Sequence, residues 1–154
     1  MILRQSVIFE ILFILILSVL SAIIYNTSSV NGIPLFYHEI TVAPDQQLSL
    51  SQTELVIWEK RALIIDARAP EEYSTGHLPG AINVPGYAAV DQILEAVKTI
   101  PKDRMIVTYC SGVSCPYADR LSGFLRFQGY RAVYVFPGGI DAWKAAGNQL
   151  NGEK

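Results

Sequence analysis

The chain has 154 residues and a mass of 17.0 kDa, which accommodates one compact domain with a short appendage but not two full domains. Its 12 basic and 14 acidic side chains give a net charge of −2 without any basic block, which argues against nucleic acid as the main partner. A hydrophobic share of 51% excludes a disordered chain. Two cysteines and two histidines are too few for a disulfide scaffold or a typical zinc site, so we expect no metal and no cofactor.

The N-terminal segment is the most apolar part of the chain and accounts for the mean hydropathy of +0.29. Between residues 7 and 25 only Glu10, Ser18 and Ser21 are not apolar. A helix of this length rises about 28 Å, enough to cross a hydrocarbon core. We expect a transmembrane helix at 7–25 that acts as an uncleaved signal anchor, because a core helix would show an amphipathic stripe. Cleavage near Ser21, which would release a secreted domain, remains the alternative.

The charges that flank this segment predict its orientation. Arg4 and the terminal amine precede it, whereas no Lys or Arg follows before Lys60. The positive-inside rule then places the N-terminus in the cytoplasm and the rest of this single-pass cell-membrane protein outside it. Residues 26–47, which contain several Gly and Pro breaks, are expected to be a tether. Its aromatic pair, Phe36 and Tyr37, packs on the domain or lies at the membrane interface.

Residues 48–150 alternate between strand and helix patterns and are expected to form one domain. The spacing of Ser51 and Glu54 is that of a capping box and predicts the start of the first helix. We expect strands at 62–66, 81–84, 104–109 and 131–136, helices at 51–60, 88–100, 116–128 and after 137–139, and a helical turn at 71–74. The predicted inward face of the helix at 88–100 consists of Val90, Ile93, Leu94, Val97 and Ile100. This alternation predicts an α/β fold with a parallel sheet covered on both faces.

Cys110 is predicted to lie at the carboxyl end of a strand, where parallel sheets form their functional crevice. The loop that follows can curl so that several backbone N–H groups face one centre, which would lower the pKa of a thiol and bind an anion. The candidate substrate-binding loop consists of Ser111, Gly112, Val113 and Ser114. A nucleophile here requires an exposed, ionised sulfur, and the residues alone equally allow a buried packing cysteine.

Two motifs flank this cysteine in the sequence. The first is IDARAPEEY at 65–73 followed by GHLPGAINVP at 76–85, and the second is PGGI at 137–140 with Trp143 and Gly147. Together they closely resemble the signatures of the rhodanese-like domain, and Cys110 falls where that family keeps its catalytic cysteine. The resemblance covers about 48–150 and implies a three-layer α/β/α sandwich around a five-stranded parallel sheet. It also implies sulfur transfer, in which Cys110 takes sulfane sulfur as a persulfide and passes it to a thiophilic acceptor.

The resemblance implies supporting roles for most signature residues. Asp66 and Arg68 are expected to pair with each other and with nearby backbone, His77 to stabilise its loop, and Trp143 to lie in the core. His38, in the tether, has no partner that the sequence identifies.

The loop departs from one family pattern in a way that bears on the substrate. It has the length found in sulfurtransferases, not the longer, arginine-closed loop of related phosphatases. Thiosulfate-using relatives commonly carry a basic residue here, but this loop has none, so an anion would depend on backbone donors with Arg68 or Arg120. We therefore predict a membrane-tethered thiosulfate or persulfide sulfurtransferase that uses thiosulfate poorly. Its partners would be a small sulfur donor, neutral or thiol-borne, and a thiol acceptor.

Cys115, at the end of the loop, allows two interpretations. It is a resolving thiol that attacks a persulfide on Cys110, or it packs under the loop as a small apolar residue. The first requires a Cα separation below about 7 Å. The alternatives for the whole chain are accordingly a thiol–disulfide or persulfide-reducing domain and a non-catalytic rhodanese-like binding module.

Overall fold

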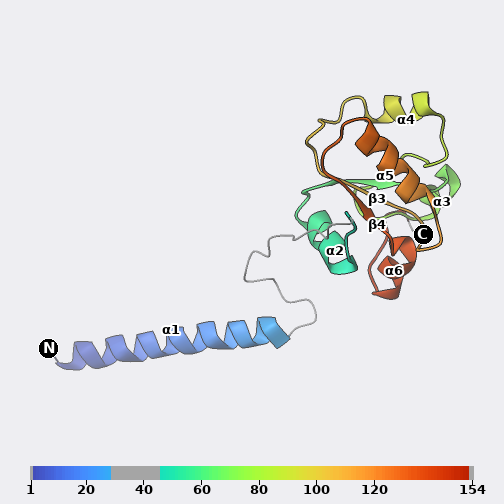
Figure 1. Ribbon diagram of the computed structural model, residues 1–154. Helices are drawn as coiled ribbons and strands as arrows, with labels where there is room; N and C mark the ends of the chain where they lie inside the picture. Colours follow the sequence, from blue (N-terminus) through green and yellow to red (C-terminus); the bar gives the residue numbers. More distant parts are fainter. Residues whose placement is uncertain (1, 29–45, 153–154) are drawn as a thin grey trace. The chain divides into compact units, whose positions relative to one another are not determined.

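The computed structural model describes residues 2–28 and 46–152, and the chain divides into two compact units, Met1–Glu39 and Ile40–Lys154 (Figure 1). The first unit contains helix α1 (Ile2–Ser28). Most of the expected tether, residues 29–45 with Phe36, Tyr37 and His38, lies outside the described residues.

Helix α1 covers the whole segment for which a membrane span is predicted and continues to Ser28. Its stretch Val7–Asn26 is long and apolar enough to cross a membrane, with a mean hydropathy of 2.9 and none of it buried within the chain. A signal sequence near an N-terminus has the same length and composition. The helix therefore fits both of the interpretations that the sequence leaves open.

The second unit is a sandwich of strands and helices that alternate along the chain (Figure 1). Its elements are α2 (Leu50–Trp58), β1 (Leu63–Asp66), α3 (Pro70–Thr75), β2 (Ile82–Asn83), α4 (Val90–Val97), β3 (Ile106–Tyr109), α5 (Tyr117–Phe127), β4 (Val133–Phe136) and α6 (Gly139–Ala145). Each predicted strand and helix is present, with ends that move by a few residues.

The strands form a parallel sheet in the order β2-β1-β3-β4. Among the described residues this sheet has four strands. The prediction of a five-stranded sheet is therefore wrong. The place of a fifth strand beside β4 is taken by residues 46–48: Leu48 N–H donates to Val135 at 2.8 Å, and Val135 N–H donates to Gln46 at 2.9 Å. This pairing is too short to form a strand because the chain turns at once into α2 at Leu50.

Helices cover both faces of the sheet, as the alternating pattern predicts (Figure 1). On the α4 and α5 side, Ile65 and Ile106 pack with Ile93, Val97 and Leu121. On the α2 and α6 side, the alternate residues pack in a second cluster that includes Val56, Ile64, Val107, Ile140 and Trp143. Because both faces are buried, the strands are apolar runs without polar alternation.

The start of α2 corrects the predicted capping box. Ser49, not Ser51, caps the helix: its Oγ accepts from Gln52 N–H at 3.3 Å, while Gln52 Oε1 accepts from Ser49 N–H at 2.8 Å. Both serines have a suitable partner three residues later, so the pattern alone is ambiguous. The buried neighbour Leu48, held against β4, decides in favour of Ser49.

Helix α4 is shorter than expected and buries a narrower face. Ile93 and Val97 are buried, but Val90 and Leu94, predicted to face inward, are exposed. The apolar periodicity identified the helix correctly and overestimated how much of its surface the sheet covers.

Candidate active site

The carboxyl ends of β1, β3 and β4 lie level at one edge of the sheet. The register pairs Asp66 with Tyr109 and Tyr109 with Phe136, so the segments that follow these strands begin side by side. They carry Arg68, Cys110 and the turn before α6. The fold thus gathers both sequence motifs and the cysteine loop at the edge where parallel sheets form functional sites.

The cysteine loop, residues 110–115, is held by the first turn of α6. Ile140 N–H donates to the Cys110 carbonyl at 3.1 Å, and Asp141 N–H donates to the Ser111 carbonyl at 2.9 Å. Gly139 makes this approach possible: its φ is +54°, and a Cβ there would lie 2.2 Å from the Cys110 carbonyl oxygen. The second sequence motif therefore has a structural purpose, which is to clamp the loop.

Cys110 and Cys115 form a disulfide, with their Cα atoms 6.1 Å apart. This separation lies within the usual range for a disulfide and below the limit that the sequence argument set. Cys110 is only 3% exposed and packs with the α4 and α5 cluster, which Cys115 also contacts. The expectation of an exposed, ionised sulfur is thus wrong for this oxidised form, because the bond to Cys115 covers the sulfur and removes its titratable proton.

The loop between the cysteines leaves its backbone donors uncommitted. Among the described residues, the N–H groups of residues 111–114 donate to no backbone carbonyl, whereas Cys115 N–H donates to Gly112 at 3.0 Å. Val113 is 87% exposed and Ser114 is exposed, while Gly112 is buried. The loop precedes α5, whose N-terminal end adds a favourable field for negative charge. In the disulfide-bonded loop these four N–H groups therefore have no backbone acceptor within residues 2–28 and 46–152.

Two carboxylates flank the loop. Glu72 Oε1 accepts from Ser111 Oγ at 3.3 Å, and its other oxygen accepts from Ala69 N–H at 3.3 Å. Asp141 lies against Gly112, where an added Cβ would be 2.5 Å from Asp141 Oδ2. Sequence reasoning missed both residues, because neither adjoins the cysteines in the chain. The loop is consequently flanked by two carboxylates and contains no basic residue.

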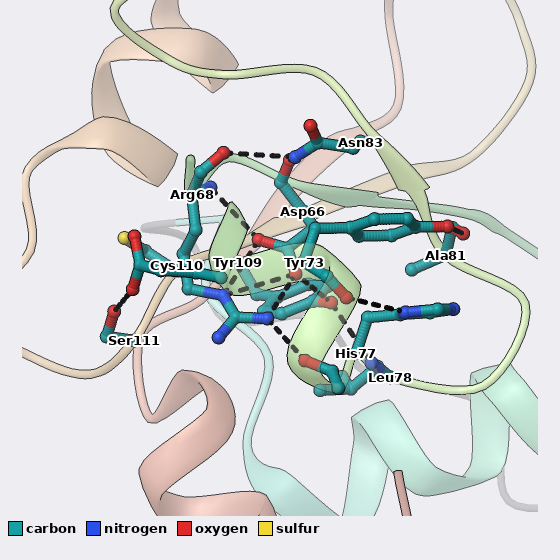
Figure 2. Close-up of polar contacts among 12 residues, drawn as sticks. Asp66, Arg68, Tyr73, His77, Leu78, Ala81, Asn83, Tyr109, Cys110 and Ser111 are labelled. Carbon is teal, nitrogen blue, oxygen red and sulfur yellow. Dashed lines mark hydrogen bonds and ion pairs between the residues drawn. The ribbon is translucent and has the colours of Figure 1, made fainter. Parts of the chain in front are cut away.

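Asp66 and Arg68 form a buried ion pair beside the loop (Figure 2). The Arg68 guanidinium donates to Asp66 Oδ2 at 2.7 Å and to the Gly76 carbonyl at 2.7 Å, while Arg68 N–H donates to Asp66 Oδ1 at 2.9 Å. The side chains are 0% and 7% exposed. The expected pairing is present, and it leaves Arg68 committed to the scaffold rather than to an anionic substrate.

Tyr109, the residue before the nucleophile candidate, joins this ion pair to the sheet (Figure 2). Its hydroxyl donates to Asp66 Oδ2 at 2.6 Å and accepts from Leu78 N–H at 3.0 Å. Burial, reinforced by the negative charge of Asp66, raises the pKa of Tyr109 well above its ordinary value, so the hydroxyl stays a donor. The sequence offered one signal for this role, a tyrosine at the buried end of a strand, which we interpreted only as a strand residue.

His77 stabilises its own loop, as the resemblance implies. Its ring stacks on Tyr73 with centroids 3.9 Å apart, and Nδ1 lies 3.0 Å from the Tyr73 carbonyl. Its backbone pairs with Asn151 in both directions. In the described part of the chain, no group of three or more His, Cys, Asp or Glu side chains is placed to hold a metal ion.

Comparison with known families identifies the class to which this fold and loop belong. The family described as Rhodanese-like domain matches residues 49–146. This is more than half of the chain, and the chain therefore belongs to the rhodanese-like domain family.

The relatives place the same domain in proteins of different kinds. The chain is 41% identical over 86 residues to a tRNA uridine(34) hydroxylase of Onion yellows phytoplasma, covering 53% of this chain and 27% of that protein. It is 38% identical over 84 residues to the HTH-type transcriptional regulator Rv0324 of Mycobacterium tuberculosis, covering 54% and 35%. The BH2092 protein from Bacillus halodurans has the same fold, with a TM-score of 0.64, 24% identity and coverage of 71% and 78%. The chain thus spans about a third or less of these curated relatives, and the likeness is confined to the domain.

Because α6 clamps the loop, we expect alanine substitution to lower the free energy of unfolding by different amounts at two glycines that both have positive φ. Gly139→Ala should destabilise the fold by at least about 3 kcal/mol, since the added Cβ meets a fixed backbone carbonyl. Gly80→Ala, at φ +74° with nothing within 4 Å, should cost only the backbone strain of about 1 to 2 kcal/mol. Urea unfolding of the two full-length variants in detergent measures the difference. Equal losses would show that α6 does not hold the loop.

Proposed function

We propose that this protein is a membrane-tethered sulfurtransferase that moves sulfane sulfur through a persulfide on Cys110. In the reduced protein the Cys110 thiolate attacks the outer sulfur of a donor R–S–SH. The bond between the two donor sulfurs breaks, the donor leaves as R–SH, and Cys110 carries the persulfide. An acceptor thiolate then attacks the outer sulfur, and the Cys110 thiolate leaves, so the cycle involves no net oxidation.

The observation that carries this proposal is the position of Cys110 at the end of β3, on a loop with uncommitted backbone donors. Such donors stabilise the thiolate, the persulfide and any oxyanion on the sulfur. Membership in the rhodanese-like family supports the same chemistry. A disulfide-bonded Cys110 is inactive in this scheme, and a thiol must first open the bond to Cys115.

The charges at the loop favour a particular kind of donor. Glu72 and Asp141 repel a dianion such as thiosulfate, and the Arg68 guanidinium, which also attracts Glu72, is committed to Asp66 and the Gly76 carbonyl. A neutral or thiol-borne persulfide meets less repulsion. We propose this donor class and slow turnover of thiosulfate.

Helix α1 supports a location at the cell membrane. As an uncleaved anchor with its N-terminus in the cytoplasm, it would hold the domain on the outer side. Tethering raises the local concentration of acceptors in the same membrane. Because the chain spans so little of its curated relatives, their activities on RNA or in transcription are not part of the proposal.

Sulfur loading tests the central step. Full-length Cys115→Ser, reduced and then freed of reductant in detergent, should gain the mass of one sulfur on Cys110 when incubated with glutathione persulfide. The matched control is the double variant Cys110→Ser/Cys115→Ser, which should gain none. Peptide mapping after alkylation locates the sulfur. If the single variant also stays unmodified, the domain is a non-catalytic binding module instead.

Charge removal at the loop tests the donor class. At low ionic strength, Glu72→Gln should raise kcat/KM for thiosulfate by about 3- to 10-fold while changing the value for a neutral donor much less, because one repulsive charge is gone. Salt should shrink this difference. Glu71→Gln is the matched control, since it removes the same charge from the exposed neighbouring residue. A Glu71 variant as fast on thiosulfate as the Glu72 variant would contradict the argument.

Membrane fractionation tests the tether. The full chain should remain in the membrane pellet after alkaline carbonate, and protease added outside intact cells should digest the domain. Replacing Ile14 and Ile16 by Lys should release it, since each charge at the middle of a span costs about 2.5 to 3.5 kcal/mol. A soluble product whose N-terminus begins after residue 21 would instead establish signal cleavage.

A further inference from the structure

The second cysteine of the loop gives the site a chemistry beyond sulfur transfer. We propose that Cys115 resolves the Cys110 persulfide, releasing hydrogen sulfide and leaving the loop disulfide, so that the domain acts as a persulfide reductase driven by a dithiol. The proposal rests on the persulfide of the proposed function. The proposal adds to that function a second catalytic residue, Cys115, a product, hydrogen sulfide, and a class of co-substrate, the dithiols.

The geometry supports resolution because the two atoms that must bond are the two that the structure already joins. In a persulfide the inner sulfur is Cys110 Sγ, and the loop disulfide links this same atom to Cys115 Sγ. The outer sulfur is the leaving group. Val113 and Ser114, between the cysteines, are exposed and Cys115 is partly exposed, so the loop lies at the surface of the domain.

In the disulfide-bonded state the loop makes backbone hydrogen bonds both with α6 and within itself. The Cys110 carbonyl accepts from Ile140 N–H, the Ser111 carbonyl accepts from Asp141 N–H, and Cys115 N–H donates to the Gly112 carbonyl. Helix α5 begins only at Tyr117, beyond the second cysteine. Disulfide formation therefore coexists with an ordered β3 and α5, and resolution requires no unfolding of either element.

The step balances without any outside oxidant. The Cys115 thiolate attacks Cys110 Sγ, the bond between Cys110 Sγ and the outer sulfur breaks, and the outer sulfur leaves as HS⁻. The two cysteines are oxidised to the disulfide and the sulfane sulfur is reduced to sulfide. The proton of the Cys115 thiol ends on the sulfide at neutral pH.

The burial of the two cysteines indicates how a dithiol restores the site. Cys110 is buried and Cys115 is partly exposed, so an incoming thiolate reaches Cys115 first. Attack on Cys115 Sγ expels the Cys110 thiolate, which the uncommitted loop donors stabilise. The second thiol of the reductant then displaces Cys115, and the reductant leaves as its own disulfide.

Resolution competes with transfer to an external acceptor. A thiol in the same loop acts at an effective concentration that a dilute external thiol does not match. Sulfide release is therefore the main outcome wherever the external acceptor thiol is dilute.

A single-turnover experiment without reductant tests the proposal, because an added dithiol would itself release sulfide from any persulfide. Full-length protein in detergent is reduced, freed of reductant without air, and mixed with one equivalent of glutathione persulfide. The wild type should release about one sulfide per chain, measured at a sulfide electrode, and end with the mass of the loop disulfide. Cys115→Ser and Cys115→Ala should both accumulate the Cys110 persulfide and release sulfide at least about 10-fold more slowly.

The outcomes separate this proposal from the one on which it rests. If the wild type keeps a stable persulfide beside a free Cys115, resolution is wrong and sulfur transfer stands. Passage of the outer sulfur onto Cys115 without sulfide release also overturns resolution. If neither the wild type nor the Cys115 variants take up sulfur, both proposals fail. Agreement of the serine and alanine variants shows that the thiol of Cys115, not its packing, is what matters.

Discussion

The ion pair between Asp66 and Arg68 is the interaction on which the site depends. It is buried, it ties β1 to the Gly76 carbonyl, and through the Tyr109 hydroxyl it reaches the last residue of β3. A buried pair of this kind contributes little as a net gain, but removing one partner leaves an uncompensated charge at a cost of about 3 to 5 kcal/mol. The ion pair matters here because of its position, since Tyr109 directly precedes Cys110 in the chain. The nucleophile candidate therefore directly follows a residue that this network fixes.

The order and type of the elements follow from sequence patterns alone, and the reasons are local. The apolar runs at 62–66 and 104–109 predict the strands that the structure places at Leu63–Asp66 and Ile106–Tyr109. Strands that are buried on both faces have apolar side chains at successive positions, so such a run is a direct signal for them. The pairing of Asp66 with Arg68 was likewise accessible, since one charge ends the strand and the opposite charge lies two residues further along the chain. The N-cap of α2 was not: Ser49 and Ser51 present the same spacing, and only a long-range contact of Leu48 chooses between them.

What the sequence leaves open at the site depends on contacts between distant segments. Glu72 and Asp141 come from α3 and α6 and meet the cysteine loop only in the folded domain. The state of Cys110 depends likewise on the folding of the loop, which brings Cys115 within bonding distance. Neither hydrophobic periodicity nor composition indicates that these residues come close together in the folded domain. The consequence is a loop that two carboxylates flank and a disulfide closes.

The clamp formed by Gly139, Ile140 and Asp141 also bears on biosynthesis. A ribosome completes both cysteines well before it makes the amides that fix their loop. Until then the emerging polypeptide presents two unrestrained thiols to whatever oxidants or chaperones it meets. The contacts that fix the loop in the folded domain consequently form only after α6 has been synthesised.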